Sequence, residues 1–424
     1  MRKKVYKEKK INTNKDLPLV EHILMRIKEE KEKTGISRTL FAACPNSISV
    51  IKAALNSAKR CNAPVKFAAT LNQVDSNRGY TGMNQNEFVK VIKQEAEALG
   101  MTGPVMVALD HGGPWLKDEH RLKNMTFVET MGLVKQSMID SLKAGYHLLH
   151  VDPTIDVSLK KDEIINIQTV ANRTLEIIIH IEKYRRENNY PAISYEVGTE
   201  EVHGGLADMK TFSEFLSILK NGLAKAGYAD VWPCFIVGKV GTDLHTTLFD
   251  AEVAKTLTAE AAKFGSVIKG HYSDNVSNPQ DYPLTGMGGA NVGPEFTENE
   301  YDGLMELVQM EEELDAQDKI AIRSNFKQVL WNAVIDSGRW KKWLLPEENE
   351  DDFFSIAEER QLWLIKTGAR YIWTNPTVEY ARVILYKNLE RRGIKAEQIV
   401  LSKIEKSMDK YFYNFNLVDF NNYI

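Results

Sequence analysis

Short apolar segments rich in Val, Ile and Phe recur along the first 300 residues and predict a series of buried strands. Most of them end in polar or glycine-rich residues and are followed by a helical pattern. Apolar runs that do not alternate strictly are typical of strands covered on both faces, as in parallel sheets. The predicted strands are 38–44, 65–70, 105–110, 147–152, 192–197, 233–238, 266–271 and 289–294.

Amphipathic helical stretches lie between these strands, for example over 47–59, 86–100 and 127–145. The last of them stops at Gly145, a residue type that favours helix C-termini. Eight strand–helix units over roughly 260 residues have the usual size of a (β/α)8 barrel. A doubly wound open sheet is the structural alternative, but it does not predict polar residues at the ends of all eight strands.

After about Glu300 the sequence becomes charge-rich, helix-forming and rich in tryptophan. We therefore predict three parts, which are an N-terminal helical lead-in over 1–35, a TIM barrel over 36–300, and a final barrel helix with a helical extension over 301–424. Amphipathic spacing alone cannot tell whether the aromatic residues of this extension form a core or surround a ligand. We interpret the aromatic residues of the extension as core or subunit interface, and we expect a homo-oligomer.

Composition excludes several function classes. Lys and Arg number 54 and Asp and Glu 58, for a net charge of −4, which argues against a bulk polyanion binder. No basic aromatic patch supports nucleic-acid binding. Three cysteines cannot form a disulfide framework, and no apolar run is long enough to span a membrane. We expect a cytoplasmic protein that binds neither nucleic acid nor membrane.

Three of the nine histidines follow predicted strands three, six and seven, namely His111, His245 and His271. The C-terminal strand ends of a barrel meet at one mouth, where catalytic residues gather. Three neutral imidazoles with an open fourth position are a type of catalytic zinc site. Asp110 and Glu196 stand beside them as candidate acid–base groups. We interpret the remaining histidines as structural or surface residues; these are His22, His120, His147, His150, His180 and His203.

Other polar residues at the strand ends are candidates for substrate binding. They are Asn46, Asn72, Gln73, Asp152, Ser273, Asp274 and Asn291. Asp152 and Asn72 could orient the metal ligands or recognise substrate hydroxyl groups.

Six strings carry a resemblance to a known family: NQVDSNRGYTGM, LDHGGPW, HVDPT, SYEVGTEEVHGGL, KGHYSD and GGANVGPEFT. The chain resembles the accessory-subunit family of class II D-tagatose-1,6-bisphosphate aldolase, the GatZ/KbaZ type, from about Thr39 to Glu300. It is more distantly similar to the catalytic, zinc-dependent class II fructose- and tagatose-bisphosphate aldolases. That second resemblance implies a TIM barrel, acid–base catalysis by Asp110 and a carboxylate role for Glu196.

The same resemblance implies zinc ligation by His111, His245 and His271, substrate binding by Asn291, and a phosphate near Ser273. The chain departs from the aldolases in three places. The run that leads to His245 is one residue longer, Ala290 replaces a lysine, and the phosphate-loop glycine and serine pattern is altered. The substrate is therefore a ketose or a ketose phosphate, and its phosphorylation is left open.

These parts predict retro-aldol chemistry, in which a metal stabilises the enediolate and Asp110 moves the hydroxyl proton. An aldolase and a ketose 4-epimerase need the same groups. Zn²⁺ fits the ligands best, with Mn²⁺ or Co²⁺ as alternatives. The alternative function is a non-catalytic subunit that stabilises a separate aldolase subunit. A sugar phosphate kinase is disfavoured because no phosphate-binding G-x4-G-K-[ST] loop occurs.

Overall fold

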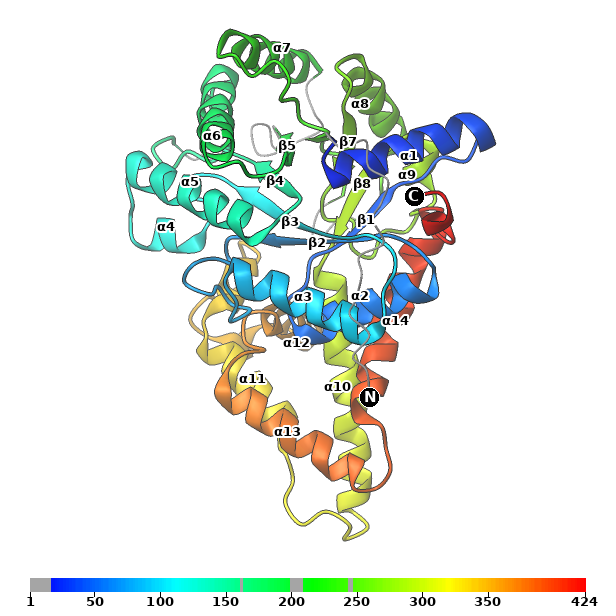
Figure 1. Ribbon diagram of the computed structural model, residues 1–424. Coiled ribbons are helices and arrows are strands. Elements are labelled where there is room, and N and C mark those ends of the chain that lie inside the picture. Colours follow the sequence, from blue (N-terminus) through cyan, green and yellow to red (C-terminus); the bar gives the residue numbers. More distant parts are fainter. Residues whose placement is uncertain (1–16, 161–162, 199–208, 243–246) are drawn as a thin grey trace.

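Eight parallel strands close into one barrel in the computed structural model, which describes residues 17–160, 163–198, 209–242 and 247–424 (Figure 1). Each strand pairs with the next along the chain, and the eighth pairs with the first. The predicted TIM barrel and its eight strands are confirmed. The strands are β1 (Leu40–Ala43), β2 (Val65–Thr70), β3 (Val105–Gly112), β4 (Leu148–Val151), β5 (Ser194–Gly198), β6 (Phe235–Val237), β7 (Val267–Gly270) and β8 (Gly289–Val292).

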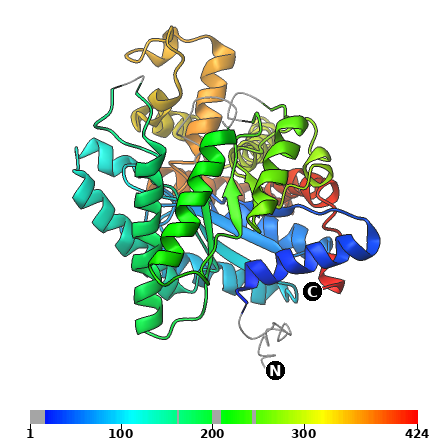
Figure 2. The same cartoon turned by 90° about the horizontal axis from the view of Figure 1, so that it is seen from above.

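The helices that follow the strands form an outer layer around the barrel (Figure 2). They are α2 (Ile48–Arg60), α3 (Gln85–Leu99), α4 (Asp118–Leu122), α5 (Phe127–Ala144), α6 (Ile167–Glu187), α7 (Met209–Lys225), α8 (Ala251–Lys263), α9 (Asp281–Leu284) and α10 (Pro294–Asp315). Local sequence explains where several of them begin and end. Asn84 and Thr126 form capping boxes at the starts of α3 and α5, and Gly145 ends α5 in the left-handed region at φ 87°.

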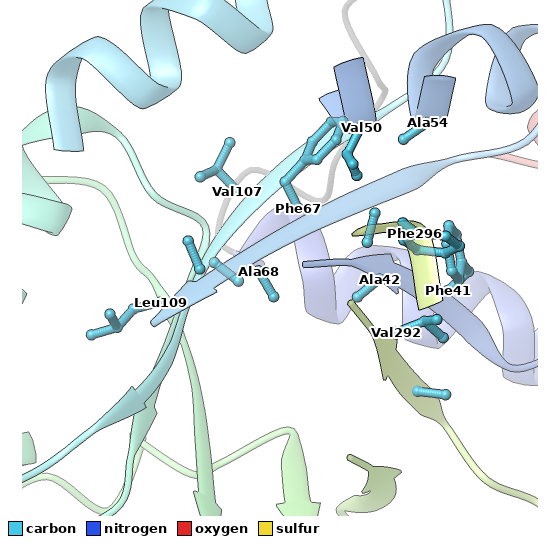
Figure 3. Packing of buried hydrophobic residues seen from close by; sticks show 14 of the residues in the cluster. Phe41, Ala42, Val50, Ala54, Phe67, Ala68, Val107, Leu109, Val292 and Phe296 are labelled. Carbon is cyan, nitrogen blue, oxygen red and sulfur yellow. The ribbon is translucent and has the colours of Figure 1, made fainter. Parts of the chain in front are cut away.

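The main core lies between the outer faces of the strands and the helices that cover them. Phe67 of β2 lies close to Val50 of α2, and Phe41 of β1 lies beside Phe296 of α10 (Figure 3). The two phenyl rings meet edge to face with their centroids 6.0 Å apart. Alternate residues of a strand point to opposite faces. The strand residues next to Phe41 and Phe67 therefore point into the barrel. The polar strand-end residues are therefore directed toward the barrel interior and its mouth.

One helix, α1 (Leu19–Thr34), precedes the barrel and contacts β5. Its Glu21 lies near Ser194, the first residue of that strand, and burial raises the pKa of Glu21. Helix α1 thus lies near the N-terminal end of the barrel, away from the strand ends that carry the candidate chemistry.

The chain beyond α10 forms a helical extension on one side of the barrel (Figure 1). It contains α11 (Phe326–Asp336), α12 (Glu358–Ala369), α13 (Pro376–Glu390) and α14 (Ala396–Asn414), with short 3-10 helices at Arg339–Trp343, Phe353–Ser355 and Phe420–Asn422. Helix α14 packs against both α10 and α2, which anchors the extension to the barrel. The domain limits at 35 and 300 stay a prediction. Among the described residues no helix is long and apolar enough to cross a membrane.

Candidate active site

The end of β3 presents two neighbouring residues, Asp110 and His111, to the same region. A regular strand would send adjacent side chains to opposite faces. Here the β3–β4 register shifts between Leu109 and Gly112, and His111 takes a left-handed backbone conformation with φ 48°. Such irregularities re-aim side chains and are frequent near active sites. The bulge explains how both residues reach the barrel mouth.

Four side chains at the mouth have ligand-type atoms that all lie within 4.8 Å of one another. They belong to Asp110, His111, His150 and His271, from β3, β4 and the end of β7. The ring centroid of His111 lies 4.4 Å from that of His271 and 4.8 Å from that of His150. The structure therefore brings together two of the three predicted metal ligands. The third, His245, lies outside the described residues.

His150 is a cluster member that the sequence analysis interpreted as structural or surface. Its side chain is buried, and its Nδ1 accepts a hydrogen bond from the backbone N–H of His111 at 3.1 Å. Burial lowers its pKa, which favours a neutral ring. A signal in the sequence could have found it. His150 lies on β4 and Asp152 directly follows that strand, so the two residues are two positions apart and share a face.

The contacts of His111 fit a metal ligand. Its Nδ1 lies 2.6 Å from Asp152 Oδ2, and Asp152 Oδ1 accepts a hydrogen bond from Thr154 at 2.5 Å. A carboxylate on one ring nitrogen fixes the tautomer and leaves the other nitrogen for a metal, an arrangement common in zinc sites. Burial raises the pKa of Asp152, but the hydrogen bond and charge of His111 outweigh burial and lower it to about 2. The donor set therefore fits a divalent ion, with Asp152 as an orienting group.

Glu196 contacts this cluster through His271 and forms a buried ion pair with Lys269. Lys269 Nζ lies 2.6 Å and 2.7 Å from the two carboxylate oxygens, and His271 Nε2 lies 3.2 Å from one of them. Burial raises the pKa of Glu196, but the charges of Lys269 and His150 outweigh burial and hold it well below its usual range. Lys269 is a functional candidate that the sequence analysis missed. It precedes His271 by two residues and so shares its face of β7.

A cavity of about 390 Å³ opens over the cluster. Eight of the residues predicted to form the site line it, and these are Asn46, Asn72, Gln73, Asp110, His111, His271, Asp274 and Asn291. Its volume falls in the range of small-molecule sites. Asp152, Glu196 and Ser273 are not among its lining residues. The predicted site residues thus divide into a cavity lining and groups that support it.

The side-chain amides that line the cavity differ in which of their polar atoms already have hydrogen-bond partners. Asn46 and Gln73 hydrogen-bond to each other, and Asn72 is bonded to the backbone of Leu116 and Asp118. These three shape the wall. Asn291 Nδ2 donates to Asp110 Oδ1 at 3.0 Å, whereas its buried Oδ1 has no hydrogen-bond partner among the described residues. Since buried polar atoms are normally satisfied, Asn291 Oδ1 is suited to accept a hydroxyl group of a ligand.

The two predicted residues after β7 have different environments. The Ser273 hydroxyl is fully buried and accepts a hydrogen bond from Tyr282 at 2.8 Å, so it holds the loop. Asp274 Oδ1 accepts the backbone N–H groups of Gly293 and Glu295 at the start of α10, at 2.8 Å and 2.9 Å. Burial raises the pKa of Asp274 to about 7, with a smaller contribution from the charge of Glu295.

The raised pKa of Asp274 predicts a pH-dependent contribution to stability. A carboxyl whose pKa is higher in the folded state stabilises the protein fully below its unfolded pKa, and this contribution is lost as pH rises through about 7. We expect the Asp274→Asn variant, which keeps the accepting oxygen, to lose less stability than the wild type between pH 4 and pH 8. The difference between the stability losses of the wild type and the variant has an upper limit of ~4 kcal/mol. Denaturant unfolding at both pH values measures it, and parallel curves would contradict the assignment.

The helical extension also contributes to the cavity. Lys342, Trp343, Arg370 and Tyr371 line it together with Arg121 of α4. The interpretation of the extension's aromatic residues holds for Trp340 and Trp373, which are buried in the core. Trp343 differs, because it lies in the cavity wall. The string NQVDSNRGYTGM meets the extension here, since the rings of Tyr80 and Tyr371 pack edge to face with centroids 5.0 Å apart.

The fold and site define a TIM-barrel protein with a histidine and aspartate cluster that could hold a metal at its mouth. Residues 24–413 match the model of the family described as D-tagatose-1,6-bisphosphate aldolase subunit GatZ/KbaZ-like. Because this match spans most of the chain, the chain belongs to the GatZ/KbaZ-like family, as its sequence motifs indicated.

Solved structures share the fold. A crystal structure of a probable tagatose 6 phosphate kinase from Sinorhizobium meliloti 1021 is similar with a TM-score of 0.74 and 21% identity, covering 89% of this chain and 100% of that one. The fructose-bisphosphate aldolase of Campylobacter jejuni is similar with a TM-score of 0.52 and 14% identity, covering 93% of this chain and 94% of that one. At these identities the two likenesses show the shared fold.

Proposed function

We propose that this chain is a metal-dependent enzyme that performs retro-aldol chemistry on a ketose or ketose phosphate, as an aldolase or a ketose 4-epimerase. The observation that carries the proposal is the cluster of Asp110, His111, His150 and His271, of which Asp110, His111 and His271 line the cavity. A purely supporting subunit needs no such convergence of ligand-type side chains on a small-molecule cavity.

We assign metal binding to His111 and His271 together with the predicted His245, and His150 is an additional candidate. A divalent ion, Zn²⁺ in the first place and Mn²⁺ or Co²⁺ as alternatives, supplies Lewis acidity toward a ketose carbonyl when it is bound. Asp152 holds the ring of His111. Lys269 neutralises Glu196 and leaves one of its oxygens 3.2 Å from His271 Nε2, which orients that ring.

Asp110 is assigned the proton transfer. In cleavage it accepts the proton of the C4 hydroxyl as the C3–C4 bond breaks, so that C4 becomes an aldehyde and the electron pair stays on C3. Return of this pair to the other face of the aldehyde gives the C4 epimer, whereas protonation at C3 releases two fragments. Asn291 Nδ2 holds Asp110 Oδ1 at 3.0 Å and keeps the carboxylate in place.

We assign the second proton transfer, at C3, to Glu196, the other candidate acid–base group of the sequence, and this role stays a prediction. Glu196 is fully buried and its oxygens are taken by Lys269 and His271. These contacts support a positioning role for Glu196 as well. The full chain tests the proposal when it is assayed on ketoses and ketose phosphates with separation of C4 epimers from triose fragments.

Metal content gives the most direct test of the ligand assignment. We expect roughly one zinc per purified chain, and we expect the His111→Ala and His271→Ala variants to lose most of it because a catalytic zinc site has few protein ligands. His150→Ala decides whether that ring binds the metal or only supports the site. His180→Ala, on the exposed face of α6, is the matched control and should keep its zinc.

The alternative function is a supporting subunit of a separate aldolase, which the family description suggests. The metal content of the purified chain, together with an assay on ketoses, separates the two functions. Wild-type protein that purifies without stoichiometric metal and turns over no ketose would contradict the enzymatic proposal. Co-purification with an aldolase subunit would then support the alternative.

A further inference from the structure

Arg370 is a buried cation in the cavity wall that lacks a counterion among the described residues. It caps the C-terminal end of α12 and is 7% exposed. Within the described part of the chain, its Nε and Nη2 atoms have no hydrogen-bond partner and no salt bridge includes it. An uncompensated buried charge is costly, so its persistence calls for a ligand.

The carboxylate of Asp118 lines the same cavity, but other cations occupy it. Asp118 accepts hydrogen bonds from Arg121 at 3.0 Å, from Arg339 at 2.5 Å and from Lys342 at 3.2 Å. One carboxylate thus accepts hydrogen bonds from three cationic side chains. This side of the cavity carries an excess of positive charge that attracts anions.

The guanidinium of Arg370 is fixed by aromatic rings. Its Cζ lies 4.8 Å from the ring centroid of Trp343 and 5.2 Å from that of Tyr371. Stacking holds the plane of a guanidinium while its N–H groups stay available, and this planar fork matches the oxygens of a phosphate or carboxylate. The buried Nε1 of Trp343 is a further donor without a partner in the described residues.

We propose that Arg370 binds an oxyanion, a phosphate ester or a carboxylate, carried by the end of the ligand that lies away from the metal-ligand cluster. One cavity of about 390 Å³ is lined by both Arg370 and His271, so a small molecule can contact the two regions together. The helical extension thereby selects anionic ligands for the barrel. That the anion is attached to a ketose rests on the proposed function, whereas the anion site itself does not.

Binding measurements on the full chain test the proposal. The probes are D-fructose 6-phosphate, D-fructuronate and uncharged D-fructose, titrated calorimetrically into protein treated with a chelator so that no turnover interferes. Inorganic phosphate is the fourth probe, read as a rise in the thermal unfolding midpoint. We expect the wild type to bind an anionic ketose about 10- to 100-fold more tightly than fructose, because hydrogen bonds to charged groups have this effect.

The Arg370→Met variant should lose this preference and bind all three sugars equally, and Arg370→Lys should retain part of it. The preferred probe identifies the anion as phosphate or carboxylate. Arg382→Met is the matched control. Arg382 also stacks on a tryptophan, and its buried Nε and Nη2 have no partner among the residues that the structure describes. Unlike Arg370, it pairs with Glu300 and does not line the cavity.

A structural role for Arg370 predicts different results. The Arg370→Met variant would then unfold at a lower temperature without phosphate, and its anion preference would equal that of the wild type. This outcome would overturn the proposal, as would a wild type that does not discriminate anionic from neutral sugars. Anion preference in a chain without zinc or turnover would leave the Arg370 site standing and would contradict the proposed function instead.

Discussion

The Asp110→Asn variant is expected to turn over its best ketose substrate about 10²- to 10⁴-fold more slowly than the wild type, the range of a general acid–base group. Asparagine keeps the shape of the side chain and can still contact Asn291, but it cannot accept the hydroxyl proton. In the wild type, burial raises the pKa of Asp110, but the charges of His111, His271 and Lys269 outweigh burial and hold it well below its usual range. The carboxylate is therefore ionised and ready to accept a proton.

The measurement is the steady-state rate of the purified, metal-loaded variant, with zinc content determined on the same sample. Asp110 is itself a member of the four-residue cluster, so zinc content separates two roles. Loss of turnover with zinc retained identifies the proton-transfer group, whereas loss of both identifies a ligand. Asp156→Asn, a change of the same chemistry outside the cavity, should leave turnover unchanged. Full activity of the Asp110→Asn variant would contradict the acid–base assignment.

The barrel could be predicted from the sequence because each buried strand produces a short apolar run in its own sequence. Val65–Thr70 was predicted at the bounds it has in the structure, and the other segments differ by a few residues at their ends. Apolar strands covered on both faces produce short apolar runs whatever their neighbours are. The candidate site followed from one rule, that the strand ends of a barrel meet at a single mouth.

The rest of the site depends on contacts that no local pattern records. The role of His150 follows from the face that it shares with Asp152, which an interpretation of single residues does not capture. Lys269 lies on β7, whereas the aldolase resemblance implies a lysine at position 290 on β8. Trp343 and Arg370 reach the cavity through the packing of the extension on the barrel, which is a matter of tertiary structure. The loop of Tyr80 gave a partial signal, since its string NQVDSNRGYTGM is one of the six that carry the family resemblance.

Replacing Lys269 by methionine is expected to lower the free energy of unfolding by ~3–5 kcal/mol, the cost of removing one partner of a buried ion pair. Both carboxylate oxygens of Glu196 lie within 2.7 Å of Lys269 Nζ, and neither residue is exposed. Methionine has a similar volume, so the variant removes the charge and leaves little empty space. Glu196 then keeps a buried charge with His271 Nε2 as a donor at 3.2 Å. Urea unfolding of metal-free protein measures the effect.

Lys66 provides the matched control, because it is also fully buried inside the barrel but has a different environment. Its Nζ lies 4.6 Å from the ring centroid of Phe235 and has no hydrogen-bond partner in the described part of the chain. Burial, with the charge of Lys269 in second place, lowers its pKa to about 8. Lys66→Met should therefore change the stability by less than ~1 kcal/mol, since no buried hydrogen bond is broken. Combining Lys269→Met with Glu196→Gln should restore most of the loss, because the double variant removes both charges. Equal losses for the two single lysine variants would show that the ion pair of Glu196 and Lys269 does not stabilise the barrel.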